Sequence, residues 1–190
     1  PYGIEVQPMA NNKPKTCTLG YLGKLNKNKG IEDLIDVYEK LLKKENFNKL
    51  EPNLLIGGVG SKNYISSINK RISNKNIQFL GYVEDRYNFF NSIKVFIFPS
   101  YSEGLGLVLL EAMSHGVLCI TRDVTPMNSI IKNGENGFLF KDNNELIEKI
   151  EKAINLNSSE KDKIVKSALE KIEKSYSIMQ MYLSIDKAYN

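Results

Sequence analysis

The sequence has few of the residues that build metal centres or disulfide frameworks. It contains two cysteines, Cys17 and Cys119, and a single histidine, His115. A structural zinc site needs several such ligands close together, so the sequence excludes one and His115 is expected to serve the core or a helix end. Both cysteines lie inside apolar runs, "TCTLGYLG" and "GVLCI". We therefore expect two buried free thiols and a reducing compartment, which favours the cytoplasm.

Long apolar spans and dense basic stripes are also missing. No apolar run reaches the length of about 18 residues that a membrane-spanning helix requires. The net charge is only +4, from 26 basic and 22 acidic residues. Most lysines alternate with glutamates, as in "IEKIEKAI", which is typical of exposed helix faces. Because no basic stripe is interleaved with aromatic residues, we expect no nucleic-acid partner.

Size and composition indicate one globular domain. The chain has 190 residues, of which 42% are hydrophobic and 25% charged, enough to bury a real core. We expect residues 1–190 to form a single domain. The start, "PYGIEVQP", is abrupt and reads as a cut. We therefore expect this domain to be one half of a two-domain protein.

Apolar runs alternate with helical patterns along the chain. Short apolar runs ending in turn residues predict strands at 17–23, 53–60, 76–83, 94–100, 117–121 and 137–140. Spacings of three and four between apolar residues predict helices at 31–44, 65–72, 84–92, 106–115 and 126–133, followed by helices in the C-terminal part. Such alternation predicts a Rossmann-like, three-layer α/β domain, with a mainly parallel sheet of about six strands and helices on both faces. We also expect a capping box at Asp142 and Glu145, and a final amphipathic helix carrying Ile178, Tyr182, Ile185 and Tyr189.

The segment "SYSEGLGLVLLEAMSHG", residues 100–116, places two glutamates around a glycine-rich turn and the start of a helix. Seven residues separate Glu103 from Glu111. A helix that begins near Gly106 would offer unpaired amides to a phosphate, and Glu111 would lie roughly 7 Å further along its axis. This order matches the sugar, diphosphate and ribose of a nucleotide sugar. Spacing alone leaves open that Glu103 only caps the helix and that Glu111 is solvated.

A second glycine turn, "YLGKLNKNKG" at residues 21–30, follows the first expected strand. Its lysines, Lys24, Lys27 and Lys29, could neutralise a diphosphate where no acidic cluster is present to hold magnesium. A solvated lysine-rich loop is the alternative. Ligands of parallel sheets bind beyond the carboxyl ends of the strands, and both glycine turns lie at such ends.

Five runs together resemble the C-terminal domain of family 4 glycosyltransferases, which are retaining enzymes of GT-B fold that use nucleotide-sugar donors without a metal. The resemblance covers nearly the whole chain and rests on "LGKLNKNKGIEDLIDVYEKL", "LLIGGVGSKN", "IQFLGYV", "VFIFPSYSEGLGLVLLEAMSHGVLCITRDV" and "IKNGENGFLF". It implies a domain that binds the donor, with no metal and no cofactor other than the donor itself. The catalytic residues that it implies are Glu103, Lys24 and Lys29.

The resemblance also implies a role for each matching residue. Lys24 and Lys29 would neutralise the donor diphosphate, and Glu103 would bind sugar hydroxyls near the reacting carbon. Glu111 would hold the ribose. The remaining donor-binding residues would contribute turns or backbone groups: Gly23, Gly58, Gly60, Val83, Gly104, Leu105, Gly106, Leu107 and Val108. Lys24 stands where the family more often has arginine, and Leu105 where it has phenylalanine.

The implied function is transfer of a hexose-type sugar, with retention, from a UDP-, GDP- or ADP-linked donor. The acceptor would be a glycan or a lipid-linked molecule, bound through a missing N-terminal domain, in surface polysaccharide synthesis such as that of capsule. The full protein would be cytoplasmic and could associate peripherally with the inner face of the membrane. We expect this domain alone to transfer nothing. Three alternatives are a non-catalytic nucleotide-sugar-binding or regulatory module, a GT-B nucleotide-sugar epimerase, and a receiver- or flavodoxin-like interaction domain.

Overall fold

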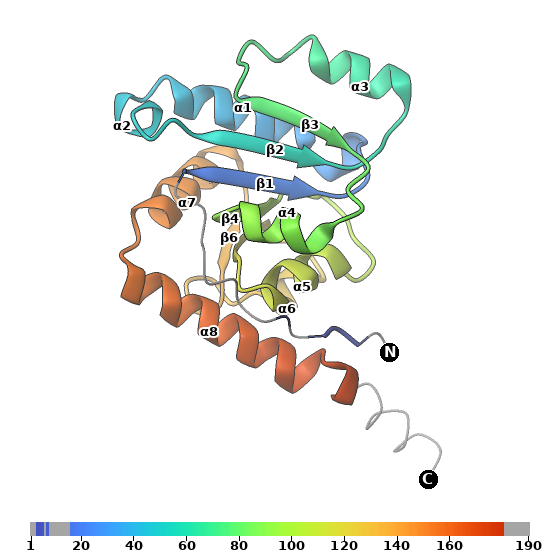
Figure 1. Cartoon of the computed structure of the whole chain (residues 1–190), viewed down its shortest axis with the longest axis vertical. Helices are drawn as coiled ribbons and strands as arrows, with labels where there is room; N and C mark the ends of the chain where they lie inside the picture. Colours follow the sequence, from blue (N-terminus) through green and yellow to red (C-terminus); the bar gives the residue numbers. More distant parts are fainter. Residues whose placement is uncertain (1–2, 6, 8–15, 181–190) are drawn as a thin grey trace.

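The fold is a three-layer α/β domain built on one parallel sheet. The computed structural model describes residues 3–5, 7 and 16–180. Its six strands lie in the order β3-β2-β1-β4-β5-β6 (Figure 1). They are β1 (Thr18–Leu22), β2 (Asn53–Gly57), β3 (Ile77–Gly81), β4 (Val95–Phe98), β5 (Leu118–Arg122) and β6 (Phe138–Phe140), and every neighbouring pair is parallel. The expected fold class is confirmed.

The strand order distinguishes this fold from one of the alternatives. Receiver- and flavodoxin-like domains have the order 2-1-3-4-5, whereas the order here is that of a Rossmann sheet. The central strands are fully buried, as in β1 and β4. Burial on both faces explains why these strands are continuous apolar runs instead of alternating patterns. The receiver-like interpretation is therefore excluded.

Helices cover both faces of the sheet. They are α1 (Ile31–Leu42), α2 (Glu45–Asn48), α3 (Lys62–Asn69), α4 (Arg86–Ser92), α5 (Leu107–Ser114), α6 (Met127–Ile130), α7 (Asn143–Asn155) and α8 (Ser158–Ser175), with a 3-10 turn, η1, at Lys27–Lys29. Helix α1 packs against α7, and α5 packs against α8. Figure 1 shows these two pairs on opposite faces of the sheet, which gives the domain its three layers.

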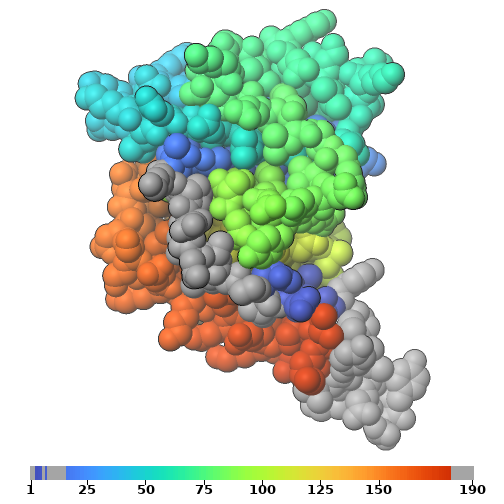
Figure 2. Space-filling view, viewed as in Figure 1, coloured from blue at the N-terminus to red at the C-terminus, as the bar shows by residue number. Residues whose placement is uncertain are grey.

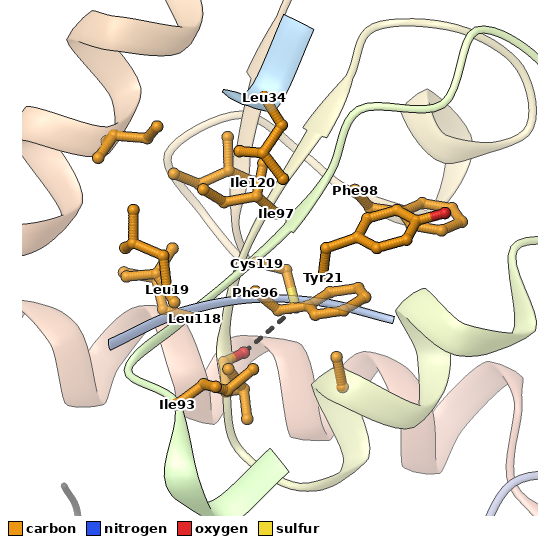
Figure 3. Close-up of a cluster of buried hydrophobic side chains, with 14 of the residues drawn as sticks. Leu19, Tyr21, Leu34, Ile93, Phe96, Ile97, Phe98, Leu118, Cys119 and Ile120 are labelled. Atoms are coloured by element: carbon orange, nitrogen blue, oxygen red, sulfur yellow. Dashed lines mark hydrogen bonds between the residues drawn. The ribbon is translucent and has the colours of Figure 1, made fainter. Parts of the chain in front are cut away.

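The core runs along β1 and β4 and ends in two aromatic rings. Figure 3 shows buried side chains from both strands gathered with residues of β5 and α1. The rings of Tyr21 and Phe98 stack with their centroids 6.5 Å apart. Each belongs to the last residues of its strand, so the rings support the loops that follow β1 and β4. Cys17 and Cys119 are both free and buried, as expected.

The helix caps differ from the expectation at α7. Oδ1 of Asp142 accepts hydrogen bonds from the N–H groups of Asn144 and Glu145, at 2.8 and 3.0 Å. The Glu145 carboxylate, however, accepts from the N–H of Lys141 and not from that of Asp142, so the expected capping box is wrong. The reciprocal box lies at the start of α8.

The segment near residue 4 lies beside the end of α8. The N–H of Ile4 donates to the carbonyl of Tyr176 at 2.7 Å, and Figure 2 shows this segment against the end of α8. Of the expected final stripe, only Ile178 is described, and Tyr182, Ile185 and Tyr189 lie outside the described residues. Within the described ranges, no helix is long and apolar enough to cross a bilayer.

Candidate functional site

The chain adds strands to the sheet in opposite directions from β1 and from β4, and the site lies where these two strands meet. From β1 the chain moves through α1 to β2, whereas from β4 it moves through α5 to β5 on the other side. The loops that follow the two strands therefore diverge and leave a crevice at the carboxyl edge, where doubly wound sheets bind ligands. Those loops are residues 23–30 and 99–106, the two glycine turns that the sequence singled out.

The two loops are joined by backbone contacts. The N–H of Tyr101 donates to the carbonyl of Asn28 at 2.9 Å. Gly30 has φ of 66°, and a Cβ at this position would collide with the carbonyl of Pro99. Only glycine combines this left-handed backbone with so close an approach. The loop after β1 is thus fixed against the loop after β4.

Two of the expected catalytic residues form an ion pair across this junction. Nζ of Lys29 donates to Oε1 of Glu103 at 2.8 Å. The two side chains are 19% and 13% exposed, so the pair is largely shielded from water. The third, Lys24, is exposed and forms no ion pair with a described residue. The structure therefore brings Lys29 and Glu103 together and leaves the Lys24 ammonium available.

Tyr21 anchors the loop that carries Lys24. Its hydroxyl donates to the carbonyl of Lys24 at 3.0 Å. Burial raises the pKa of Tyr21, and the negative charge of Glu103 raises it further. Tyr21 therefore stays a hydrogen-bond donor at neutral pH, and the Lys24 backbone has a fixed position.

The amino end of α5 faces an open groove. Gly106 precedes the helix with φ of 72°, and no side chain caps the first turn. The groove has a volume of about 820 Å³. Its lining comprises Glu103, Gly104, Leu105, Gly106, Leu107 and Val108 on one side and Ser175 and Tyr176 on the other. An uncapped helix start beside a groove can hold an anion such as phosphate.

Glu111 is paired with an arginine that the sequence analysis did not identify. Nη1 of Arg86 donates to both carboxylate oxygens of Glu111, at 2.8 and 2.7 Å. The Glu111 side chain is 27% exposed, so it is neither buried nor a freely solvated helix residue. His115 ends α5, with Nδ1 2.8 Å from the Glu111 carbonyl oxygen, which confirms its expected role at a helix end.

The glycine turns after β2 and β3 lie at the same edge. The N–H of Gly58 donates to the carbonyl of Gly81 at 2.7 Å, and a Cβ on Gly58 would collide with the carbonyl of Gly23. A Cβ on Gly60 would collide with that of Leu25. The half-buried Val83 lies against the end of β2. The expected donor-binding residues in the loops after β1, β2, β3 and β4 thus lie at the carboxyl edge of the sheet, whereas Leu107, Val108 and Glu111 belong to α5.

The sequence did not reveal a cluster formed by Arg122, Asp33 and Tyr101 near Glu103. Arg122, whose side chain is 7% exposed, donates to a carboxylate oxygen of Asp33 at 2.6 Å. The Tyr101 hydroxyl donates to the same oxygen at 2.5 Å. The sequence offered one signal, an arginine directly after the apolar run "VLCIT". Its partner Asp33 is 89 residues away, and no local pattern connects the two.

Three polar atoms near these loops are buried without a hydrogen-bond partner among the described residues. They are Oδ1 of Asn26, the Tyr64 hydroxyl and Oγ of Ser100. Burial raises the pKa of Tyr64 to about 12. Within the part of the chain that the structure describes, no group of three His, Cys, Asp or Glu side chains could hold a metal ion.

Comparison with known proteins links the chain to one family. The family model described as "Glycosyl transferases group 1" matches residues 5–171. The capsular polysaccharide biosynthesis glycosyltransferase CapM of Staphylococcus aureus is 32% identical over 176 residues, which are 90% of this chain and 45% of CapM. The chain thus spans less than half the length of this relative.

Solved structures share the fold. A mutant of S. aureus TarM, solved with UDP, fondaparinux and alpha-GlcNAc-glycerol, superposes with a TM-score of 0.86 at 24% identity. The match covers 99% of this chain and 38% of TarM. The C-terminal domain of a group 1 family glycosyl transferase, LpcC of Francisella tularensis, gives a TM-score of 0.78 at 22% identity, over 91% of this chain and 97% of that domain.

Proposed function

The chain belongs to the group 1 glycosyl transferases, and on that premise we propose that it is the C-terminal, donor-binding domain of a two-domain GT-B enzyme. The enzyme transfers a hexose-type sugar from a nucleoside diphosphate to an acceptor, with retention of configuration. The share of CapM that the chain matches supports the assignment to half of an enzyme. So does the superposition on the isolated LpcC domain.

The observation that carries the proposal is the position of Glu103. This carboxylate lies in the loop after β4, next to the loop after β1, between the uncapped start of α5 and the Lys29 ammonium. A diphosphate at the helix start would place its attached sugar next to Glu103, which can accept hydrogen bonds from sugar hydroxyls. Glu111, further along the same helix, would accept bonds from the ribose.

The same geometry accounts for stabilisation of the transition state. As the bond between sugar and diphosphate breaks, negative charge grows on the departing phosphate. Lys24, Lys29 and the first amides of α5 stabilise that charge. These groups supply the positive charge without a metal ion. Glu103 meanwhile holds the sugar whose anomeric carbon becomes cationic.

The biological setting in this proposal is surface polysaccharide synthesis in the cytoplasm of a bacterium. It rests on the similarity to CapM, a capsular polysaccharide biosynthesis glycosyltransferase. The acceptor, a glycan or lipid-linked molecule, would bind through the N-terminal domain, and the full protein would work at the inner face of the membrane. Without that domain, residues 1–190 bind donor and transfer nothing.

Thermal unfolding with a panel of ligands tests the proposal. UDP, GDP, ADP and their glucose or mannose conjugates are compared at up to about 100 times the dissociation constant. Saturation at that level adds roughly 2.7 kcal/mol to the free energy of unfolding, which raises the melting temperature of a domain this size by several degrees. One base should be preferred. No shift with any member, or sugar transfer by residues 1–190 alone, contradicts the proposal.

A further inference from the structure

The guanidinium of Arg122 joins three segments beneath the loop that carries Glu103. Besides Asp33, it donates to the carbonyl of Pro99 at 3.0 Å and to that of Lys141 at 3.1 Å. These partners belong to α1, to the loop after β4 and to the loop after β6. An arginine with three directed bonds and little exposure has one accessible orientation, so it fixes its partners relative to the sheet.

Asp33 is the meeting point of the same cluster. Its Oδ2 accepts hydrogen bonds from Arg122 and Tyr101, and its Oδ1 accepts one from Asn143 at 3.4 Å. The Tyr101 ring also covers the Arg122 guanidinium, whose central carbon lies 4.0 Å from the ring centroid. The hydrogen bond to Asp33 raises the pKa of Tyr101, so this phenol remains a donor. Tyr101 is therefore held by its backbone, its hydroxyl and its ring.

Glu103 lies only two residues after Tyr101, and Gly104 follows it. A Cβ on Gly104 would meet no atom within 4 Å, so nothing packs against the loop on that side. The carboxylate is thus fixed from one direction by Lys29 and from the other only through the backbone that leaves Tyr101. The ion pair with Lys29 orients the carboxylate of Glu103, but it does not by itself hold the backbone of the loop, since part of its gain is offset by the entropy of ordering two side chains.

We propose that Asp33, Tyr101 and Arg122 form a positioning unit that holds the loop of residues 99–103 so that Glu103 meets the donor sugar. The proposal rests on the proposed function, because it assigns Glu103 to the sugar. None of the three residues needs to touch the donor. Their contribution is to fix the backbone from which Glu103 projects, since a displacement of about 1 Å weakens an oriented polar contact strongly.

Tyr101→Phe tests this unit without disturbing the fold. Removing Arg122 or Asp33 would leave a buried charge unpaired and could unfold the domain. Tyr101 is 50% exposed, and phenylalanine keeps the ring over the guanidinium while it loses only the bond to Asp33. Tyr38→Phe is the matched control, because it removes one tyrosine hydroxyl bond, to the carbonyl of Pro52, from the same helix as Asp33.

The readout is the ratio of two dissociation constants, that of the nucleoside diphosphate and that of its sugar conjugate. Titration calorimetry would use UDP with UDP-glucose, GDP with GDP-mannose and ADP with ADP-glucose. For the pair that binds the original protein, Tyr101→Phe should leave the diphosphate affinity within about twofold. It should reduce the gain in affinity that the sugar provides roughly three- to tenfold, the range that corresponds to the net contribution of one ordinary hydrogen bond. Tyr38→Phe should lower the melting temperature and leave the ratio unchanged.

Each other outcome contradicts either the positioning unit, the role of Glu103 or the proposed function. If Tyr101→Phe and Tyr38→Phe give the same ratio as the original protein, the positioning unit is refuted while donor binding stands. The same holds if Tyr101→Phe weakens both ligands equally. If the sugar adds no affinity in the original protein, the role of Glu103 fails and the unit with it. If none of the six ligands binds, the proposed function itself is wrong.

Discussion

At the residue scale, the acidic groups of the site are already paired before any ligand arrives. Lys29 holds Glu103 and Arg86 holds Glu111. An ionised carboxylate has about four lone-pair positions, so each glutamate keeps acceptors for hydroxyl groups while its orientation is fixed. The ion pairs therefore orient the acceptors and do not exhaust them. We expect donor binding to add to these pairs without breaking them.

Substitution of the two glutamates should separate the sugar from the nucleoside. Glu111→Ala should weaken binding of a nucleoside diphosphate and of its sugar conjugate alike, by roughly tenfold or more, because a charged acceptor for the ribose is lost. Glu103→Ala should weaken only the sugar conjugate. Dissociation constants for both ligands measure the division. Glu148→Ala, at an exposed position of α7, is the control and should change neither constant. Equal losses for both ligands in Glu103→Ala would contradict the division.

The sequence could reveal the site residues that belong to a short contiguous motif. Glu103, Gly106 and Glu111 belong to one contiguous segment, and the turn at Gly30 follows the lysines in a second. The ion pair of Lys29 and Glu103 joins residues 74 positions apart, and the bond of Tyr101 to Asp33 spans 68. Such pairs depend on the order in which strands enter the sheet. Arg86, Asp33 and Arg122 were therefore missed.

At the element scale, the periodicity of apolar residues located every strand of the sheet to within a few residues. The expected ends were too long where a glycine turn follows, as at 53–60. The strand β2 ends at Gly57, because Gly58 has φ of 137°, a backbone conformation that a strand does not contain. The short elements η1 and α2 were missed. Neither is long enough to present an apolar face, and η1 buries no residue at all. Local polar segments of this kind are fixed by the loops around them.

The cap of α8 provides a prediction at this scale. Asn157 and Glu160 exchange hydrogen bonds of 3.0 Å between each side chain and the other's backbone N–H. Asn157→Ala should cost about 1 kcal/mol of the free energy of unfolding, since it leaves an N–H group of the first turn without its partner. Urea unfolding measures this cost. Asn157→Ser keeps an acceptor and should retain most of the stability, whereas equal losses for both variants would contradict the capping role.

At the scale of the whole molecule, buried thiol and phenol groups make the free energy of unfolding fall at alkaline pH. Burial raises the pKa of Cys119 and Cys17 above the ordinary value of 9.0 and that of Tyr21 and Tyr38 above 10.0. The unfolded chain releases these protons first as pH rises. Their stabilisation is therefore complete below about pH 9 and is lost above it, at about 1.4 kcal/mol per pH unit for each group that ionises only on unfolding.

Urea unfolding at pH 8, 9, 10 and 10.5 in a reducing buffer measures this dependence. The free energy of unfolding should fall progressively above pH 9, first through the thiols and then through the phenols. Cys119→Ala removes one of the groups and should make the decline between pH 9 and pH 10 shallower, whatever its effect on stability at pH 8. A stability that is constant or rises over this interval would show that these groups ionise equally in the folded protein.

The pairing of β1 with β4 has a consequence for the order of folding. These neighbours are separated in the chain by every element from η1 to α4, including β2 and β3. The entropic cost of closing that long loop therefore falls on the step that brings the two strands together. The crevice does not exist until that step is complete, because each strand supplies one of its walls. A half-assembled chain holding β1, β2 and β3 alone has no place for an anion. Ligand capture would therefore report the final assembly of the molecule, and a fluorescent nucleotide added during refolding would time that event.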